Sequence, residues 1–171
     1  VLIHHLIRHG QLLSFPSSLA TNAYGNGLHY NTNLKNTHWK GCAMIAALCV
    51  GAGGFCGAIA RYLLGLLPYQ GQFPLITFVI NFTGAVVIGA VVEAANVRPG
   101  MLPSNAVLFL KTGLCGGFTT FSTFSLETLG LLERGEYAIG GAYALGSLTA
   151  CVLGVVTGKM LVRWALGAQA A

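Results

Sequence analysis

Four long apolar segments alternate with short polar stretches along most of the chain. They cover residues 42–67, 73–95, 106–132 and 137–162. Proline, glycine and charged residues gather in the connections between them, which read PYQGQ, NVRPGMLPSN and ERGE. A helix needs about 20 apolar residues to cross the roughly 30 Å of hydrocarbon in a bilayer, and each segment reaches that length. The pattern therefore predicts four transmembrane helices.

A soluble helical bundle is the main structural alternative. Its helices would carry a polar face that repeats about every 3.6 residues. The stretch IGGAYALGSLTACVLGVVTG in the last apolar segment has no charged residue on any face. Of the 171 residues, 54% are hydrophobic and 8% are charged, and the mean hydropathy is +0.70. Soluble domains carry about 25% charged residues, so the sequence predicts an all-α membrane protein.

Residues 1–40 differ in composition from the rest of the chain. They hold all five histidines and many asparagines, serines and threonines, and they contain no apolar run long enough to span a bilayer. We therefore expect a disordered or artefactual N-terminal extension over residues 1–40 and a four-helix membrane domain over residues 41–171. Basic residues outside the spans gather on the side of both termini, which the positive-inside rule places in the cytoplasm.

The third segment carries a polar run at its centre, which reads GGFTTFSTF from Gly116 to Phe124. A single serine or threonine in a membrane helix usually bonds to its own backbone. Five hydroxyl residues within seven positions, directly after a glycine pair, favour an interruption of the helix. We expect the interruption at Gly116–Gly117, in the middle of the membrane. Carbonyl groups freed there can hold a cation, and amides or hydroxyls can hold an anion.

Further candidate groups lie at mid-span positions. Phe121 and Phe124 are three residues apart and share a helical face, where their positive ring edges can attract a small anion or simply pack against other helices. Asn81 lies in the middle of the second segment, and its amide either joins two helices or donates to a passing ligand. A mildly polar stripe on one face of the fourth segment is formed by residues spaced four apart, which are Tyr143, Ser147 and Cys151.

The candidate groups are neutral, and this restricts the possible functions. Hydroxyls, amides and ring edges without a carboxylate suit an anion better than a cation. The chain has no aspartate, and no nucleophile occurs together with a base and an orienting acid, so an enzyme is not expected. The net charge of +5 is scattered and forms no basic stripe, so nucleic acid is not an expected partner.

Three motifs resemble those of the Fluc/CrcB fluoride channel family. They read GGFCGAIARY (53–62), TFVINFTG (77–84) and GLCGGFTTFSTFSLE (113–127), in this order, and the third is the most specific. The resemblance extends from residue 43 to the C-terminus. It implies four-span subunits that insert in both orientations and pair as antiparallel homodimers in the cell's inner (plasma) membrane. Such a dimer is expected to export fluoride passively through two narrow pores and so to protect the cell from fluoride toxicity.

The resemblance also implies roles for individual residues. An anion pore is expected to include Arg61, Asn81, Thr120, Phe121, Ser122, Thr123, Phe124, Tyr143 and Ser147. Among these, Arg61 is expected near the cytoplasmic entrance of the pore, although its side chain can also reach the membrane interface as an ordinary snorkelling arginine. A structural sodium ion is implied at the centre, held by the backbone carbonyls of Gly116 and Thr119.

Two other classes of membrane protein remain as alternatives. A small proton-coupled multidrug or cation transporter has a similar length and number of spans, but it normally needs a titratable carboxylate deep in a span. Glu93 and Glu127 are the only candidates, and both lie toward the ends of their spans. A scaffold subunit without transport activity would need only the three pairs of glycines spaced four apart, but it would leave the hydroxyl run unexplained.

Overall fold

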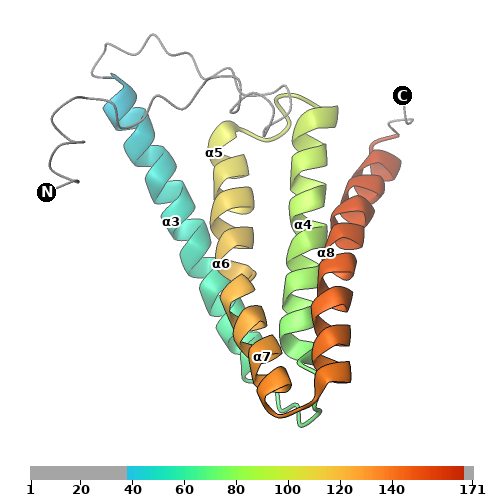
Figure 1. The fold of residues 1–171 in the computed structure, drawn as a ribbon. Helices are drawn as coiled ribbons and strands as arrows, with labels where there is room; N and C mark the ends of the chain where they lie inside the picture. Colours follow the sequence, from blue (N-terminus) through green and yellow to red (C-terminus); the bar gives the residue numbers. More distant parts are fainter. Residues whose placement is uncertain (1–37, 168–171) are drawn as a thin grey trace, which may run out of the picture. The chain divides into compact units, whose positions relative to one another are not determined.

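The structure is a computed structural model that describes residues 38–167. It contains three long helices, α3 (His38–Gly65), α4 (Leu75–Val97) and α8 (Tyr137–Ala165), shown in Figure 1. Within the described range these are the helices that are long and apolar enough to cross a membrane. They correspond to the first, second and fourth apolar segments. The expected extension over residues 1–40 lies almost entirely outside the described residues.

The third apolar segment forms a series of shorter helices. These are α5 (Ser104–Val107), the π-helix η1 (Leu108–Cys115), α6 (Gly116–Phe118) and α7 (Phe121–Glu133). Between α6 and α7 the backbone is extended, with φ −78° and ψ 157° at Thr119 and φ −148° and ψ 113° at Thr120. The Thr119 N–H is the last helical donor before the interruption, because it still donates to the Cys115 carbonyl, and a new helix begins at Phe121.

The position of this interruption corrects the expectation from the sequence, which placed it at Gly116–Gly117. Gly116 has helical dihedrals, with φ −64° and ψ −38°. Gly117 lies against α3, and a Cβ atom there would overlap the carbonyl oxygen of Gly54. The second glycine is therefore explained by the close approach of two helices, while the chain leaves the helix at the threonines that follow.

Small residues allow the helices to pack closely, as their spacing predicted. Helix α3 packs against η1 and α6, and α4 packs along α8. A Cβ atom on Gly57 would overlap the carbonyl oxygen of Leu114, and one on Gly158 would overlap that of Val86. Side chains larger than hydrogen would separate these backbones, so the prediction that the glycine pairs lie at helix contacts is confirmed.

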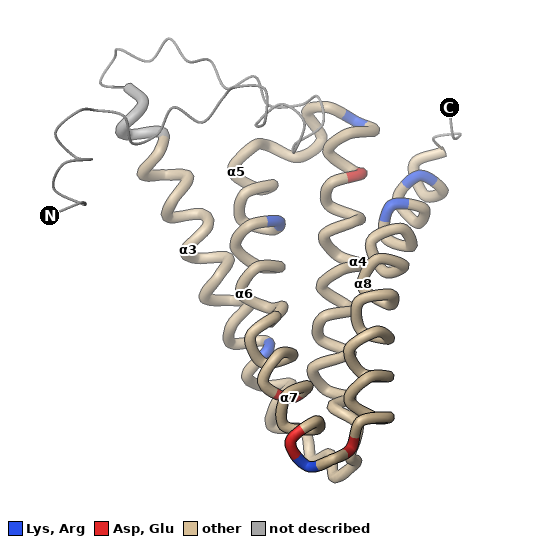
Figure 2. The backbone as a smooth tube through the Cα atoms, viewed as in Figure 1, with Lys and Arg blue, Asp and Glu red and all other residues tan. Residues whose placement is uncertain are grey.

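Charged residues lie mainly toward the two ends of the helices, and the lengths between them are largely uncharged (Figure 2). Toward the C-terminal end of α8, Arg163 donates to the carboxylate of Glu93, and Lys159 lies 3.4 Å from it. Glu93 is only 3% exposed. Its carboxylate is thus buried and paired with two basic residues near the C-terminal ends of α4 and α8.

Candidate functional site

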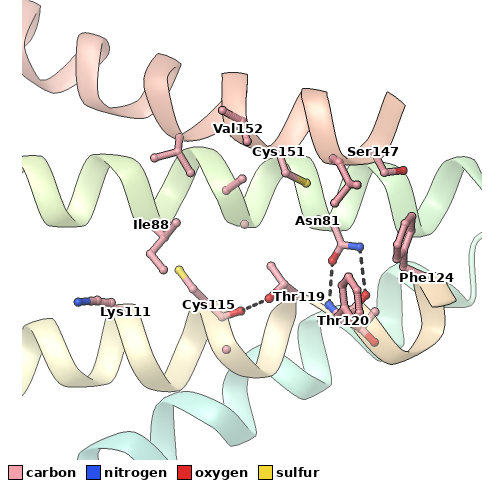
Figure 3. Close-up of a pocket in the computed structure, with 16 residues that line it drawn as sticks. Asn81, Ile88, Lys111, Cys115, Thr119, Thr120, Phe124, Ser147, Cys151 and Val152 are labelled. Carbon is pink, nitrogen blue, oxygen red and sulfur yellow. Dashed lines mark hydrogen bonds between the residues drawn. The ribbon is translucent and has the colours of Figure 1, made fainter. Parts of the chain in front are cut away.

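The site is centred on the interruption between α6 and α7. Asn81, six residues after the start of α4 at Leu75, faces the extended residue Thr120 and binds both of its backbone groups (Figure 3). The side-chain Nδ2 donates to the Thr120 carbonyl over 3.1 Å, and the Thr120 N–H donates to Oδ1 over 2.8 Å. Thr120 is the N-cap of α7, so its carbonyl can still accept the first hydrogen bond of that helix, but its N–H has no helical acceptor. The Asn81 amide supplies that missing acceptor and adds a second hydrogen bond to the carbonyl.

Thr120 also begins the second half of the interrupted segment. Its hydroxyl oxygen accepts from the Thr123 N–H over 3.2 Å, which satisfies one of the free amides in the first turn of α7. The same hydroxyl bonds to the Thr123 hydroxyl at 2.9 Å and lies 3.3 Å from that of Ser122. Part of the hydroxyl run is therefore explained by the capping of α7.

A cavity of about 420 Å³ lies beside the interruption. Its polar residues are Asn81, Lys111, Thr119, Thr120 and Ser147, and the rest of its lining is apolar side chains, cysteines and glycines. Asn81 carries two N–H groups on its side chain, one of which serves Thr120, so the second can serve a ligand. The described lining residues include a lysine but no carboxylate, so the cavity favours an anion over a cation.

Phe121 and Phe124 both line this cavity, with ring centroids 5.4 Å apart. They differ strongly in burial within the chain. Phe124 is 8% exposed and packs on Tyr143 with a centroid distance of 5.3 Å, whereas Phe121 is 72% exposed. The structure therefore brings together the two rings predicted from their spacing, and it leaves one of them uncovered on the surface of a single chain.

The stripe predicted on α8 divides between two environments. Ser147 lines the cavity, is 5% exposed, and its hydroxyl has no hydrogen-bond partner among the described residues. A buried hydroxyl without a partner is costly, so it is suited to receive a polar ligand. Tyr143 is fully buried one turn earlier, and its hydroxyl donates to a carboxylate oxygen of Glu127 over 2.6 Å.

Glu127 links three helices, and the sequence analysis did not predict these contacts. Its second carboxylate oxygen accepts from the Thr77 hydroxyl over 2.8 Å, so it joins α4, α7 and α8. The spacing of Thr77 and Glu127 from predicted site residues could have indicated these contacts. Thr77 lies four residues before Asn81, and Glu127 lies three after Phe124, so each shares a helical face with a predicted site residue.

The remaining predicted residues lie around the interruption in different ways. Gly116 and Thr119 line the cavity, and the Thr119 hydroxyl donates to the Cys115 carbonyl over 2.9 Å. Ser122, Thr123 and Arg61 do not line it. The Nε of Arg61 donates to the carbonyl of Gly117 over 3.1 Å. Gly117 lies two residues before the interruption in the sequence.

The fold and the site together define a multi-pass helical membrane protein with an anion-favouring cavity at an interrupted helix. Over residues 48–159 the chain matches the family described as CrcB-like protein, Camphor Resistance (CrcB). The chain therefore belongs to the CrcB-like family, as its motifs suggested.

Named relatives agree with this assignment. The chain is 46% identical over 119 residues to the fluoride-specific ion channel FluC of Nitrobacter winogradskyi, a match that covers 68% of this chain and 94% of that protein. It is 44% identical over 118 residues to the protein of the same name from Chlorobaculum tepidum, with coverages of 68% and 93%. The corresponding protein of Ruminiclostridium cellulolyticum is 42% identical over 125 residues, with coverages of 70% and 94%.

Proposed function

We propose that this chain is the subunit of a fluoride channel, which lets fluoride leave the cell passively and so protects it from fluoride toxicity. The observation that carries the proposal is the lining of the cavity. It combines the Asn81 amide, the unpartnered Ser147 hydroxyl and two phenylalanine rings, without a carboxylate. The names of the relatives supply fluoride as the particular anion.

The proposed path relies on neutral groups that replace water around the anion. An amide N–H and a hydroxyl can each donate one hydrogen bond, and ring edges add a weak positive potential. Because these donors are uncharged, they bind an anion without holding it too tightly for conduction.

The proposed active unit is a homodimer of antiparallel subunits in the inner (plasma) membrane. A pore needs walls on every side, yet Phe121 and Ser122 are exposed on the surface of one chain. A second copy placed over this face would enclose them. Chemical cross-linking in membranes is expected to give a dimer, and a species that remains monomeric while it conducts fluoride would overturn this part of the proposal.

A structural sodium ion between the two subunits is also proposed, with the carbonyls of Gly116 and Thr119 as its ligands. The donor set fits such an ion. Thr120, whose N–H would serve the Gly116 carbonyl in a continuous helix, donates to Asn81 instead, and Gly116 is exposed on the single chain. Bound sodium would supply a fixed positive charge that the carbonyl dipoles coordinate. Dialysis against a sodium-free buffer should therefore lower the thermal stability of the purified dimer.

Growth in fluoride tests the proposed function in cells. A bacterial strain that lacks its own fluoride export should regain growth at inhibitory fluoride concentrations when it expresses this chain. Expression of Asn81→Asp at the same membrane level should not restore growth, because the new carboxylate repels the anion. Failure of the unaltered chain to protect, despite its presence in the membrane, would contradict the proposal.

A further inference from the structure

Arg61 makes a contact that neither a snorkelling arginine nor a charge at a pore entrance requires. It lies four residues before the end of α3 at Gly65, and its side chain is partly buried. The Nε donates to the Gly117 carbonyl over 3.1 Å. Gly117 belongs to α6, so this contact ties the first apolar segment to the last turn before the interruption.

The need for this contact follows from the interruption itself. In a continuous helix the Gly117 carbonyl would accept from the N–H of Phe121, four residues later. The extended backbone at Thr119 and Thr120 removes that donor, because Phe121 begins a new helix. A carbonyl left without a partner inside a membrane protein is strongly unfavourable, and the Arg61 guanidinium supplies the missing N–H.

Close packing of the two backbones brings Arg61 within reach. A Cβ atom on Gly57 would overlap the Leu114 carbonyl oxygen and lie 2.7 Å from the Phe118 nitrogen. One helical turn after Gly57 along α3, Arg61 therefore lies beside the end of α6. The interruption is held on one side by Asn81, which binds Thr120, and on the other by Arg61, which binds Gly117.

We propose that Arg61 is a positioning residue whose Nε–H replaces the missing backbone donor of the interrupted helix and so fixes the geometry of Thr119, Thr120 and Phe121. This inference rests on the proposed channel function. It assigns the role of Arg61 to one hydrogen bond, whereas a charge at a pore entrance would act by attracting the anion. The two roles differ in which substitutions preserve flux.

Two substitutions of similar size separate the roles. In glutamine the side-chain nitrogen lies the same number of bonds from the backbone as Nε of arginine, so Arg61→Gln keeps a donor and removes the charge. In methionine a methyl group occupies that place, so Arg61→Met removes both. Arg98→Met, in the exposed loop after α4, controls for the loss of one positive charge away from the interruption.

The measurement is fluoride efflux from liposomes, with size-exclusion chromatography as the check of assembly. Wild-type efflux tests the channel function separately from this inference. We expect Arg61→Gln to stay within about fivefold of wild type, because a neutral hydrogen bond replaces a charge-assisted one, and Arg61→Met to lose about tenfold or more. Arg98→Met should conduct like the wild type.

The opposing outcomes are equally definite. Equal losses in the assembled Gln and Met variants would assign Arg61 an electrostatic role, and wild-type flux in both would remove it from the pore's support. If Arg61→Met does not assemble, the flux of Arg61→Gln alone decides between the positioning role and the electrostatic role. An assembled Gln variant that conducts near the wild-type rate supports the inference, and a loss of tenfold or more overturns it.

Discussion

Replacing Phe121 and Phe124 by isoleucine separates ring chemistry from ordinary packing. Isoleucine is apolar and of comparable bulk, but it has no ring edge to offer an anion. Both rings line the cavity, so Phe121→Ile and Phe124→Ile should each sharply reduce fluoride flux. A methionine at either position is polarisable and should restore part of the flux.

The structure predicts different costs in stability for the two variants. Phe124 is 8% exposed and loses two ring contacts, to Phe121 and Tyr143, with centroid distances of 5.4 and 5.3 Å. Each such pair contributes about 0.5–1.5 kcal/mol, so Phe124→Ile should lower the free energy of unfolding by about 1–3 kcal/mol. Phe121 is exposed and makes one ring contact, to Phe124, so Phe121→Ile should lower the free energy of unfolding by about 1 kcal/mol or less.

Efflux from liposomes and unfolding in mixed detergent measure the two effects independently. Phe55 provides the matched control, because it is 68% exposed on α3 and does not line the cavity. Phe55→Ile should leave both flux and stability close to the wild type. Full fluoride flux in both Phe121→Ile and Phe124→Ile, with assembly unchanged, would refute the reasoning and return these rings to a packing role.

Three further changes test separate parts of the structure. Asn81→Asp keeps an acceptor for the Thr120 N–H, but it removes the donor to the Thr120 carbonyl and adds a charge that repels the anion. An assembled variant should therefore lose fluoride efflux, and wild-type efflux would remove Asn81 from the pore. Gly57→Ala should lower the free energy of unfolding by about 1–3 kcal/mol, because its Cβ overlaps the backbone of η1, whereas Gly51→Ala should not, since nothing lies within 4 Å of the added carbon. Removal of residues 1–37 should leave efflux unchanged, since the family match begins at residue 48, and a folded but inactive truncation would contradict that expectation.

The long helices could be predicted closely from the sequence. The fourth segment was predicted over residues 137–162, and α8 covers Tyr137–Ala165. Bilayer thickness sets a minimum length for such a segment, and charged or turn-forming residues mark its ends, so hydropathy alone locates it. The helix contacts at the glycine pairs could also be predicted, because only a small residue permits the close backbone approach seen at Gly57 and Gly158.

The details of the site depended on tertiary contacts that one segment does not encode. The hydroxyl run indicated an interruption, but its position at Thr119–Thr120 is supported by Asn81, which lies on another helix and accepts from the Thr120 N–H. The sequence placed Glu127 toward the end of its span and indicated no partner for it. Its partners Thr77 and Tyr143 come from two other helices, and they draw its carboxylate inward.

Fluoride efflux from liposomes that contain the purified protein tests the central claim most directly. With a fluoride gradient as the only driving force and the same pH on both sides, a fluoride electrode should record rapid release. Liposomes loaded with chloride should retain it. Release that requires a proton gradient would instead indicate the coupled transporter, and equal release of both anions, or of neither, would contradict a fluoride channel.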